Sequence, residues 1–414
     1  MPNICIYFQV HQPFRLKWFW PHEARIKERE LKKKEDLNDL YFDTKLNKWI
    51  FQKVADKCYF PTNNIILNLI DQFKSENRKF KLSYSLTGTF IEQCERFSPE
   101  LLDTFRDMKK SGCVEFLGET YYHSLSSLFE DKTEFIEEVK MHTQLMKDVL
   151  GVKPQVFRNT ELLYNNETAK EAKKLGFNAM LAEGIEWVLD GWKSPNHVYE
   201  SPDKMKILLR NYKLSDDVGY RFSAKWWTEH PLTADKYASW LSTAPGDTIN
   251  LFMDYETFGE HQWADTGIFE FLKNVPREIL KYDHLEFSTP SEIINKFKPA
   301  GELDIPWFKT FSWADLERDT SAWIGDYNQK MCFNEVQHLG WLVSKSNNPE
   351  FKKLWRYLLT SDHFHYMSTK GMGDGSVHEY FSHHGNPYDA AINYLAVVSD
   401  LKEKVLKEMG KINI

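Results

Sequence analysis

Short runs of apolar residues alternate with amphipathic stretches over roughly the first 300 residues of the chain. The apolar runs have the length and composition of strands that are buried on both faces. Several of the stretches between them repeat their apolar positions at helical spacing. The predicted strands are 4–10, 80–86, 113–117, 155–158, 177–182, 205–209, 249–254 and 284–287. The predicted helices are 64–76, 99–110, 134–150, 167–175 and 269–281.

This alternation predicts βαβ units and therefore a parallel sheet in an α/β fold. The number of units favours closure into a barrel of seven or eight strands. An open doubly wound sheet is the alternative, but no GxGxxG sequence follows the first predicted strand. From about Pro306 onward the pattern changes to long amphipathic helices over 315–344, 349–367 and 389–407, with no strands between them. An α-helical C-terminal region is therefore expected.

Polar and protonatable residues follow five of the predicted strands, at the point where each strand ends. In parallel α/β barrels the active site is built at this face, from the carboxyl ends of the strands. Five such positions in one register therefore point to a functional site. The residues are His11 and Gln12, Glu119 and His123, Glu161, Glu183, and Asp254 with Glu256.

Asp254 and Glu256 end the β-branched apolar run TINLFM, and a turn glycine, Gly259, and His261 follow them. Residues i and i+2 of a strand point to the same side, so both carboxylates are expected to leave the sheet together. Repulsion between them raises the pKa of at least one. The alternative is a helix N-terminus, where the helix dipole favours acidic residues.

Two carboxylates from different strands, one ionised and one protonated, are the minimal set for breaking a glycosidic bond. Glu161 follows Arg158 and Asn159, whose charge and hydrogen-bond donors favour the ionised form of a nucleophile. Asp254 has Glu256 beside it and an apolar strand behind it, which favour the protonated form of a general acid. A salt bridge with Arg158 is the alternative role for Glu161.

Composition and motifs argue against several other classes of protein. A net charge of −7 without a long basic stripe argues against nucleic acid as a partner. The five cysteines are scattered without a CxxC sequence, so neither a disulfide framework nor a zinc ribbon is indicated. No HExxH motif is present, and we expect no catalytic metal and no other cofactor. The sequence shows neither a signal sequence nor an apolar run of roughly 20 residues. We therefore expect a cytoplasmic protein that does not associate with a membrane.

Five segments resemble the sequence signatures of the family-57 glycoside hydrolases, in the right order and over nearly the whole chain. His11-Gln-Pro13 resembles the first of them. In the third, this chain has RNTELLY where many members have a tryptophan and a proline near the glutamate. The other resemblances are those of 118–123 (GETYYH) to the second signature, 158–164 to the third, 252–261 (FMDYETFGEH) to the fourth and 313–326 to the fifth.

The resemblance implies a distorted (β/α)7 barrel followed by a C-terminal α-helical bundle, and hence seven barrel strands. The expected domains are a catalytic barrel over residues 1–300 and an α-helical region over 301–414 that closes the substrate cleft. The resemblance also implies retaining chemistry on α-1,4-glucans, with Glu161 as nucleophile and Asp254 as acid/base. We therefore expect a glycoside hydrolase of the α-amylase type, with a 4-α-glucanotransferase or a non-catalytic glucan-binding protein as alternatives. The short chain weighs against the larger branching enzymes.

A further set of side chains is expected to contact the α-glucan or maltooligosaccharide substrate. Imidazoles and carboxylates hydrogen-bond sugar hydroxyls, and tryptophans are candidate stacking platforms, although core packing is the alternative for each tryptophan. The candidates are His11, Gln12, Glu119, His123, Trp187, Glu256, His261, Trp313, Trp323, Asp362 and Asp374.

Overall fold

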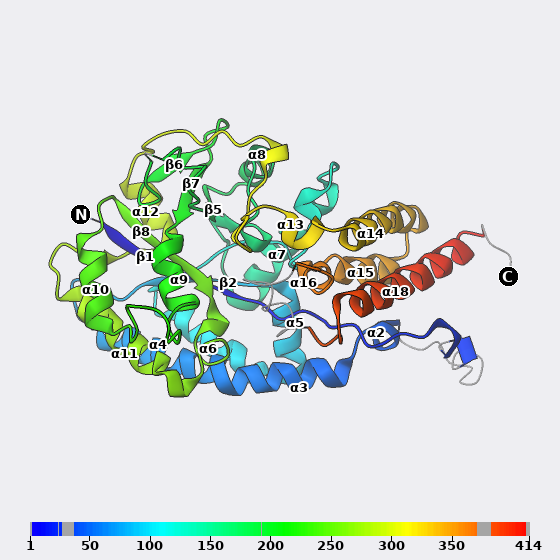
Figure 1. The fold of residues 1–414 in the computed structure, drawn as a ribbon, viewed down its shortest axis with the longest axis horizontal. Helices are drawn as coiled ribbons and strands as arrows, with labels where there is room; N and C mark the ends of the chain where they lie inside the picture. The colour runs from blue at the N-terminus through cyan, green and yellow to red at the C-terminus, as the bar shows by residue number, and fades with distance from the viewer. Residues whose placement is uncertain (1, 24, 27–36, 192, 371–381, 411–414) are drawn as a thin grey trace. The chain divides into compact units, whose positions relative to one another are not determined.

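The computed structural model describes residues 2–23, 25–26, 37–191, 193–370 and 382–410 (Figure 1). Contacts between residues divide the chain into two compact units. Unit 1 comprises Met1–Gln12, Ile50–Tyr121 and Ile136–Ser312, and unit 2 comprises Pro13–Trp49, Tyr122–Phe135 and Trp313–Ile414. Unit 2 thus contains two early segments that a single boundary after residue 300 does not include.

Unit 1 carries the strands in two sheets. One sheet has the order β3-β2-β1-β8, with β9 also paired to β1, and the other has the order β4-β5-β7-β6. All pairs are parallel except β6 with β7. The strands are β1 (Asn3–Val10), β2 (Leu82–Leu86), β3 (Val114–Phe116), β4 (Val156–Arg158), β5 (Ala179–Glu183), β6 (Val198–Glu200), β7 (Lys206–Arg210), β8 (Thr248–Asp254) and β9 (Glu286–Phe287).

Two seams join these sheets into a ring. At the first, Gly118 just beyond β3 forms a parallel bridge with Phe157 of β4. At the second, the N–H of Asn211 after β7 donates to the carbonyl of Asn250 in β8 over 2.8 Å. The parallel strands β1, β2, β3, β4, β5, β7 and β8 therefore follow one another around a barrel whose backbone ladder is interrupted at the seams. The predicted distorted (β/α)7 barrel is confirmed, with seven strands rather than eight.

Alternation along the strands separates a helix-covered face from the interior of the ring. The even-numbered residues of β1 from Ile4 belong to the hydrophobic core with the surrounding helices. Tyr7 and Gln9 therefore point to the other face. In the register of β1 with β8, Tyr7 lies opposite Phe252, and Gln9 lies opposite Asp254. The interior thus becomes polar toward the carboxyl ends of the strands.

Helices surround the strands of unit 1. Side-chain caps begin several of them; the Thr87 hydroxyl, for example, accepts from the N–H of Phe90 at the start of α5. The helices are α4 (Phe60–Gln72), α5 (Gly88–Phe97), α6 (Pro99–Lys110), α8 (Asn166–Lys174), α9 (Tyr212–Gly219), α10 (Ala234–Thr243), α11 (Ile268–Leu280) and α12 (Pro290–Lys296), while α3 (Thr44–Val54) and α7 (Thr133–Leu150) begin in unit 2. A π-helical turn, η1 (Ala55–Tyr59), joins α3 to α4.

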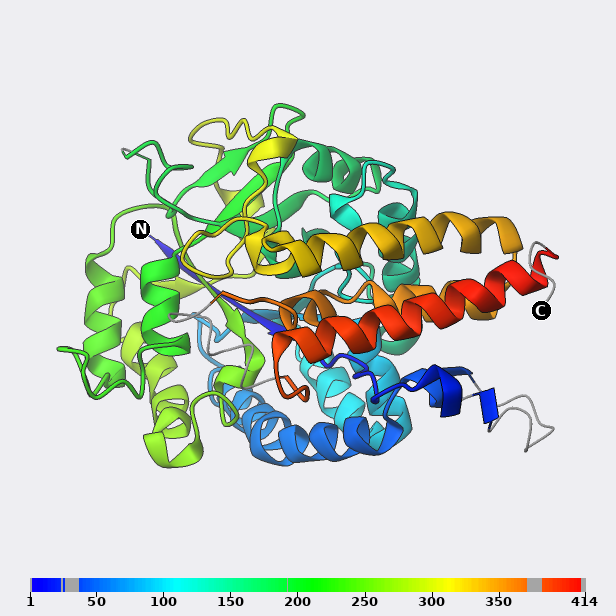
Figure 2. The same cartoon turned by 45° about the vertical axis from the view of Figure 1, so that its right-hand side comes forward.

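Unit 2 contains the predicted C-terminal helical bundle, in which α14, α15 and α18 lie side by side (Figures 1 and 2). The expected helix over 315–344 begins only at Tyr327. Asp315 and Arg318 have left-handed backbone angles (φ 56° and 50°), and Asp326 caps the helix by accepting from the N–H of Gln329. The helices are α2 (Leu37–Tyr41), α13 (Ser321–Ile324), α14 (Tyr327–Ser346), α15 (Pro349–Leu358), α16 (Ser361–His365) and α18 (Pro387–Glu408).

Candidate functional site

Gln9 connects the strand ends that precede the two predicted catalytic carboxylates. It lies opposite Asp254 in the β1–β8 register. Its Oε1 accepts a hydrogen bond from Nη2 of Arg158, the last residue of β4. Glu161 follows three residues after Arg158. One buried amide in the ring interior therefore links the strand that carries Asp254 to the strand that leads into Glu161.

Charged groups from several strand ends act on Tyr7, whose side chain points into the same interior. Burial raises the pKa of this phenol, the charge of Arg158 lowers it, and the charges of Glu119 and Asp254 raise it. The phenol also shares a 2.6 Å hydrogen bond with the hydroxyl of Ser85. Three charges from three strand ends thus act on one buried side chain, as expected where the carboxyl ends of barrel strands converge.

Glu161 lies in a short 3-10 turn (η3, Thr160–Leu162) with a left-handed backbone, φ 54° and ψ 26°. A residue other than glycine pays roughly 1–2 kcal/mol for this conformation, which tends to persist where function or the surroundings require it. The turn is held by a bond from Nδ2 of Asn159 to the carbonyl of Leu163 (2.9 Å) and by the hydroxyl pair of Thr120 and Thr160 (2.7 Å). The side chain of Glu161 is partly exposed while its neighbours are buried.

The predicted acid pair at the end of β8 is confirmed in part. Strand β8 ends at Asp254, and Glu256 lies in the following 3-10 turn, η4 (Tyr255–Thr257), so the two do not share a strand face. Asp254 is partly exposed, whereas Glu256 is buried and accepts a hydrogen bond from the phenol of Tyr59. Burial first, and then the charge of Asp254, raise the pKa of Glu256 to about 8. The pKa of Glu256 is thus raised, as predicted for at least one acid of the pair, and the protonated form of Asp254 stays a prediction.

His11 and Gln12 lie at the end of β1, beside Glu256. Nδ1 of His11 is 3.0 Å from the hydroxyl of Thr87. Nε2 of Gln12 donates to the phenol oxygen of Tyr59 over 3.0 Å. The structure thus brings the first and fourth signature segments together through Tyr59, a residue that the sequence analysis did not select.

Glu119 is fully buried at the end of the third strand of the ring. Its N–H donates to Nδ1 of His142 (3.3 Å), while Nε2 of His142 donates to the carbonyl of Leu86 (2.8 Å). Burial lowers the pKa of His142, and the charge of Glu119 opposes this shift. Sequence reasoning missed His142, because one histidine within a helical pattern carries no signal of its own.

His261 follows the same turn as Glu256. Burial lowers the pKa of His261 to about 4, against the opposing charge of Glu260, so the ring is neutral near pH 7. Glu260 is buried and pairs with Lys53 (2.5 Å) and Lys57 (3.7 Å).

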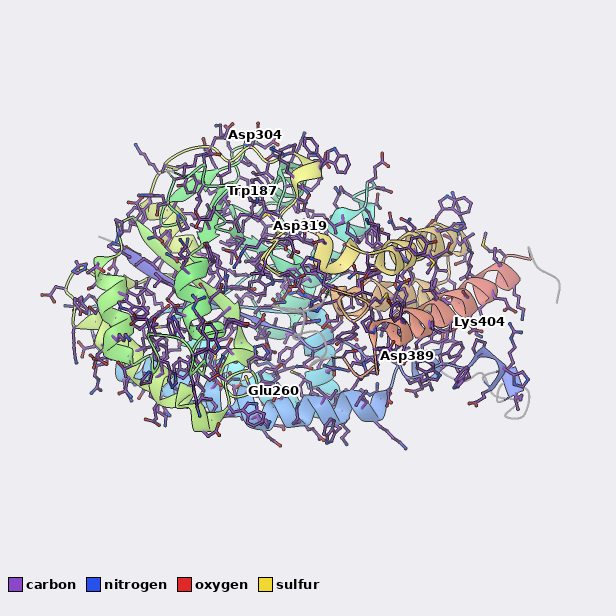
Figure 3. The ribbon with its side chains drawn as sticks, in the orientation of Figure 1. Trp187, Glu260, Asp304, Asp319, Asp389 and Lys404 are labelled. Atoms are coloured by element: carbon purple, nitrogen blue, oxygen red, sulfur yellow. The ribbon has the colours of Figure 1, made fainter. Side chains whose placement is uncertain are left out.

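Trp187 is 47% exposed, as a stacking platform requires. Its ring meets the ring of Phe311 edge-on at 5.7 Å, and Phe311 packs against Tyr164 at 5.4 Å, three residues beyond Glu161. Trp187 therefore ends an aromatic row that begins beside the turn of Glu161. Figure 3 shows it well apart from Glu260, in a different part of unit 1.

The remaining candidates belong to unit 2 or lie outside the described residues. His123 is buried, and its carbonyl accepts from the N–H of Ser361 over 2.9 Å. Trp313 and Asp362 are partly exposed. Trp323 is 1% exposed, so it occupies a core position and its prediction as a stacking platform is wrong. Asp374 lies outside the described residues.

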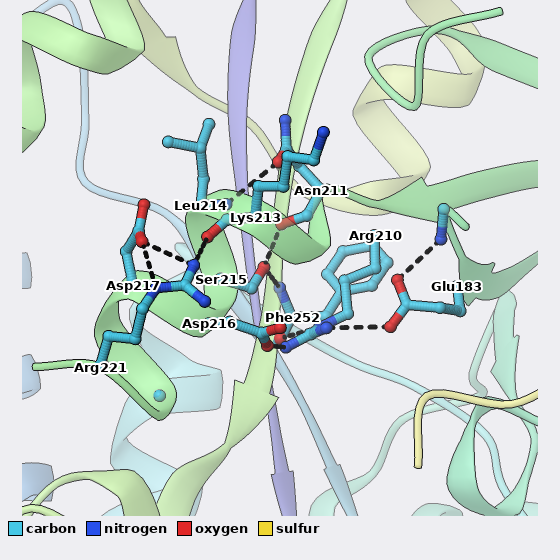
Figure 4. Close-up of polar contacts among 12 residues, drawn as sticks. Glu183, Arg210, Asn211, Lys213, Leu214, Ser215, Asp216, Asp217, Arg221 and Phe252 are labelled. Carbon is cyan, nitrogen blue, oxygen red and sulfur yellow. Dashed lines mark hydrogen bonds and ion pairs between the residues drawn. The ribbon is translucent and has the colours of Figure 1, made fainter. Parts of the chain in front are cut away.

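Glu183, a further strand-end acid, has a structural partner (Figure 4). Arg210 donates to Glu183 over 2.9 Å, to Asp216 over 2.5 Å and to the carbonyl of Phe252 over 2.8 Å. Burial lowers the pKa of Arg210, but the charges of Asp216 and Glu183 outweigh it and keep the guanidinium ionised. This network ties β5, β7, α9 and β8 together at the second seam.

Within the described ranges, no group of three or more His, Cys, Asp or Glu side chains is placed to hold a metal ion. Among the helices in the described part of the chain, none combines the length and the hydrophobicity of a membrane-spanning helix.

Comparisons with known proteins identify relatives of the chain. A family model described as glycosyl hydrolase family 57 matches residues 5–306. A Methanocaldococcus jannaschii protein whose α-amylase name is itself provisional is 50% identical over 98% of this chain and 85% of its own length. The 4-α-glucanotransferase of Thermococcus litoralis is 21% identical, and the match covers 64% of this chain and 39% of that enzyme.

A solved family-57-type branching enzyme from Pyrococcus horikoshii has the same fold. It superposes with a TM-score of 0.64 at 15% identity, over 99% of this chain and 95% of that one.

Proposed function

Because this chain belongs to glycosyl hydrolase family 57, and is thus a glycoside hydrolase or transferase, we propose that it cleaves α-1,4-linked glucans with retention of configuration. The substrate is an α-glucan or a maltooligosaccharide, in keeping with the names of the relatives. The reaction is hydrolysis of the α-amylase type, with 4-α-transfer as the second candidate.

In the proposed mechanism, the ionised carboxylate of Glu161 attacks the anomeric carbon. Asp254 protonates the glycosidic oxygen as its bond to that carbon breaks, and a covalent glycosyl-enzyme forms. Asp254, now a carboxylate, then takes a proton from water or a sugar hydroxyl, whose oxygen displaces Glu161 from the same carbon. Two inversions return the original configuration, and both carboxyl groups regain their starting states.

The observation that carries this assignment is the bond from Arg158 to Gln9, opposite Asp254. It supports a common site for two carboxylates that the chain separates widely. The left-handed turn at Glu161 and the partial exposure of both carboxyl groups support the same assignment, since each must reach a sugar ring. Retention requires the two carboxyl groups to lie about 5–5.5 Å apart.

We further propose that His11, Gln12, Glu119 and His261 of unit 1 line the same site and bind hydroxyls. Trp187 offers an exposed ring for stacking on a sugar. His123, Trp313, Asp362 and Asp374 remain candidate substrate ligands. The first three are described residues of unit 2, and Asp374 lies outside the described residues.

Product analysis with maltoheptaose tests this function. Shorter sugars alone indicate hydrolysis, sugars both shorter and longer than heptaose indicate 4-α-transfer, and new α-1,6 linkages indicate branching. A non-catalytic glucan-binding protein would bind maltoheptaose and leave it intact, and this outcome would reject the enzymatic proposal.

A further inference from the structure

The long helix from α3 to α4 changes to a π-helical turn where it meets the loop after Asp254. Such turns occur frequently at functional sites. The thiol of Cys58 donates to the carbonyl of Tyr255 over 3.3 Å, and the phenol of Tyr59 donates to Glu256. Two residues of the turn therefore donate hydrogen bonds to the segment that directly follows the proposed acid/base.

The same loop is held on its far side by a close approach of two backbones. Gly259 has φ +112°, and a Cβ atom there would lie 2.0 Å from the carbonyl oxygen of Lys57. Beyond it, the buried carboxylate of Glu260 pairs with Lys53 and Lys57. The loop after Asp254 is thus fixed against the π-helical turn at four positions, Tyr255, Glu256, Gly259 and Glu260.

Tyr59 has a defined hydrogen-bond direction. The amide nitrogen of Gln12 can only donate, so the phenol oxygen accepts from it and directs its single proton to Glu256. Glu256 also receives a hydrogen bond from the backbone of His11. Gln12 is held in turn by Nε2 of Gln93, which donates to its carbonyl over 2.9 Å. The carboxyl of Glu256 therefore accepts hydrogen bonds from two segments, the π-helical turn at Tyr59 and the end of β1 at His11.

We propose that Glu256 is a positioning residue that shares one proton with Asp254, and that Tyr59 of the π-helical turn regulates how firmly the pair retains it. This inference rests on the proposed role of Asp254 as acid/base. The pair holds one carboxyl and one carboxylate, and its proton resides on Asp254 when a glycosidic bond is to be cleaved. Glu256 does not touch the reacting atoms, and its effect on the reaction passes through Asp254.

Burial and the charge of Asp254 raise the pKa of Glu256 to about 8, while the bonds from Tyr59 and His11 oppose the shift. Since like charges repel, the carboxylate of either residue makes it harder to remove the proton from the other. The pair is therefore expected to keep one proton up to about pH 8. The charge of Glu256 acts on Cys58, Tyr59 and Tyr255, and the backbone of His11 donates to its carboxylate. Glu260, which also acts on Cys58, pairs with Lys53 and Lys57.

The test is the pH profile of kcat/KM on maltoheptaose for the wild-type protein and two variants. Glu256→Gln keeps an acceptor for Tyr59 and His11 but removes the charge, so the alkaline limb should move to lower pH by about one unit. Tyr59→Phe removes a donor that favours the ionised form of Glu256, so the limb should move to higher pH. A role limited to structure would lower the rate without moving the limb in opposite directions.

Matched controls come from the same unit. Glu115 is a second carboxyl whose pKa burial raises, and its partner is Ser291 rather than a site residue. Tyr237 donates to the carbonyl of Leu214 over 2.8 Å and has no contact with the pair. Glu115→Gln and Tyr237→Phe should leave the alkaline limb where it is in the wild-type protein.

A measurement on the wild-type protein makes the test independent of how well the variants fold. In infrared difference spectra, the band of a protonated carboxyl should disappear with a midpoint near pH 8 in the wild-type protein and at lower pH in Glu256→Gln. An active enzyme whose limb is unmoved in both variants, or moves the same way in both, overturns this inference and leaves the proposed function standing. A wild-type protein inactive on every α-glucan overturns the proposed function itself.

Discussion

Arg158 at the end of β4 donates a hydrogen bond to Gln9 of β1, a residue 149 positions earlier in the chain. Both side chains are buried. Because Gln9 lies opposite Asp254, this bond aligns the strand that leads into Glu161 with the strand that carries Asp254. The geometry of the proposed site therefore depends on a contact between two residues that are not themselves proposed to react.

Gln9→Leu tests this alignment. Loss of the acceptor leaves part of a buried guanidinium without its partner, which should cost roughly 1–3 kcal/mol of unfolding free energy. The kcat on maltoheptaose should fall at least tenfold, since small displacements of catalytic groups are costly. Gln155→Leu, at an exposed position just before β4, is the control and should behave as wild type. An unchanged kcat in Gln9→Leu would show that the alignment does not matter for the reaction.

Glu161→Gln and Asp254→Asn should each remove most of the activity and leave the fold intact. Each change removes a group that is required in a chemical step, so less than about a tenth of the wild-type rate is expected, equivalent to a barrier at least ~1.4 kcal/mol higher. Circular dichroism and thermal unfolding check the fold. The exposed residues Glu167 and Asp265 provide isosteric controls, Glu167→Gln and Asp265→Asn, which should retain full activity.

Most barrel strands could be predicted from the sequence, because they are short apolar runs with polar residues at or just after their carboxyl ends. Strand β6 (Val198–Glu200) was missed: it is three residues long, antiparallel and without a distinct apolar pattern. The start of α14 was placed too early, because local amphipathicity does not reveal the left-handed residues Asp315 and Arg318.

The strand-end acids could also be predicted, but their environments could not. Glu183 carries the same sequence signal as Glu161, yet its carboxylate pairs with Arg210, which is distant in sequence. The raised pKa of Glu256 results from its burial in a 3-10 turn and from the charge of Asp254, while the hydrogen bond from Tyr59 opposes it. Such effects depend on tertiary contacts that a single sequence does not specify.

The network around Arg210 predicts a stability effect without a direct role in chemistry. Arg210→Met should destabilise unit 1 by about 3–5 kcal/mol, because the buried carboxylate of Glu183 loses its partner. Adding Glu183→Gln should recover part of this loss, and chemical denaturation of the single and double variants measures it. Additive losses in the double variant would contradict the coupling drawn in Figure 4.

The raised pKa of Glu256 predicts that the free energy of unfolding depends on pH. Its pKa is about 8 in the folded protein against an ordinary value of 4.5, so the folded state binds more protons than the unfolded state between these values. The free energy of unfolding should therefore fall as pH rises through this window, by at most about 1.4 kcal/mol per pH unit from this group. In Glu256→Gln this contribution should be absent. If the free energy of unfolding changes with pH by the same slope in the wild-type protein and in Glu256→Gln, the pKa of Glu256 is not raised by folding.

The most direct test of the central claim is to trap the covalent intermediate with a fluorinated glucosyl fluoride and map the labelled peptide by mass spectrometry. The proposed mechanism predicts one added fluoroglucosyl group on the carboxylate of Glu161, with fluoride as the leaving group, and no label in Glu161→Gln. A fluoroglucosyl group on another residue, or turnover of maltoheptaose with inversion of the anomeric centre, would contradict it.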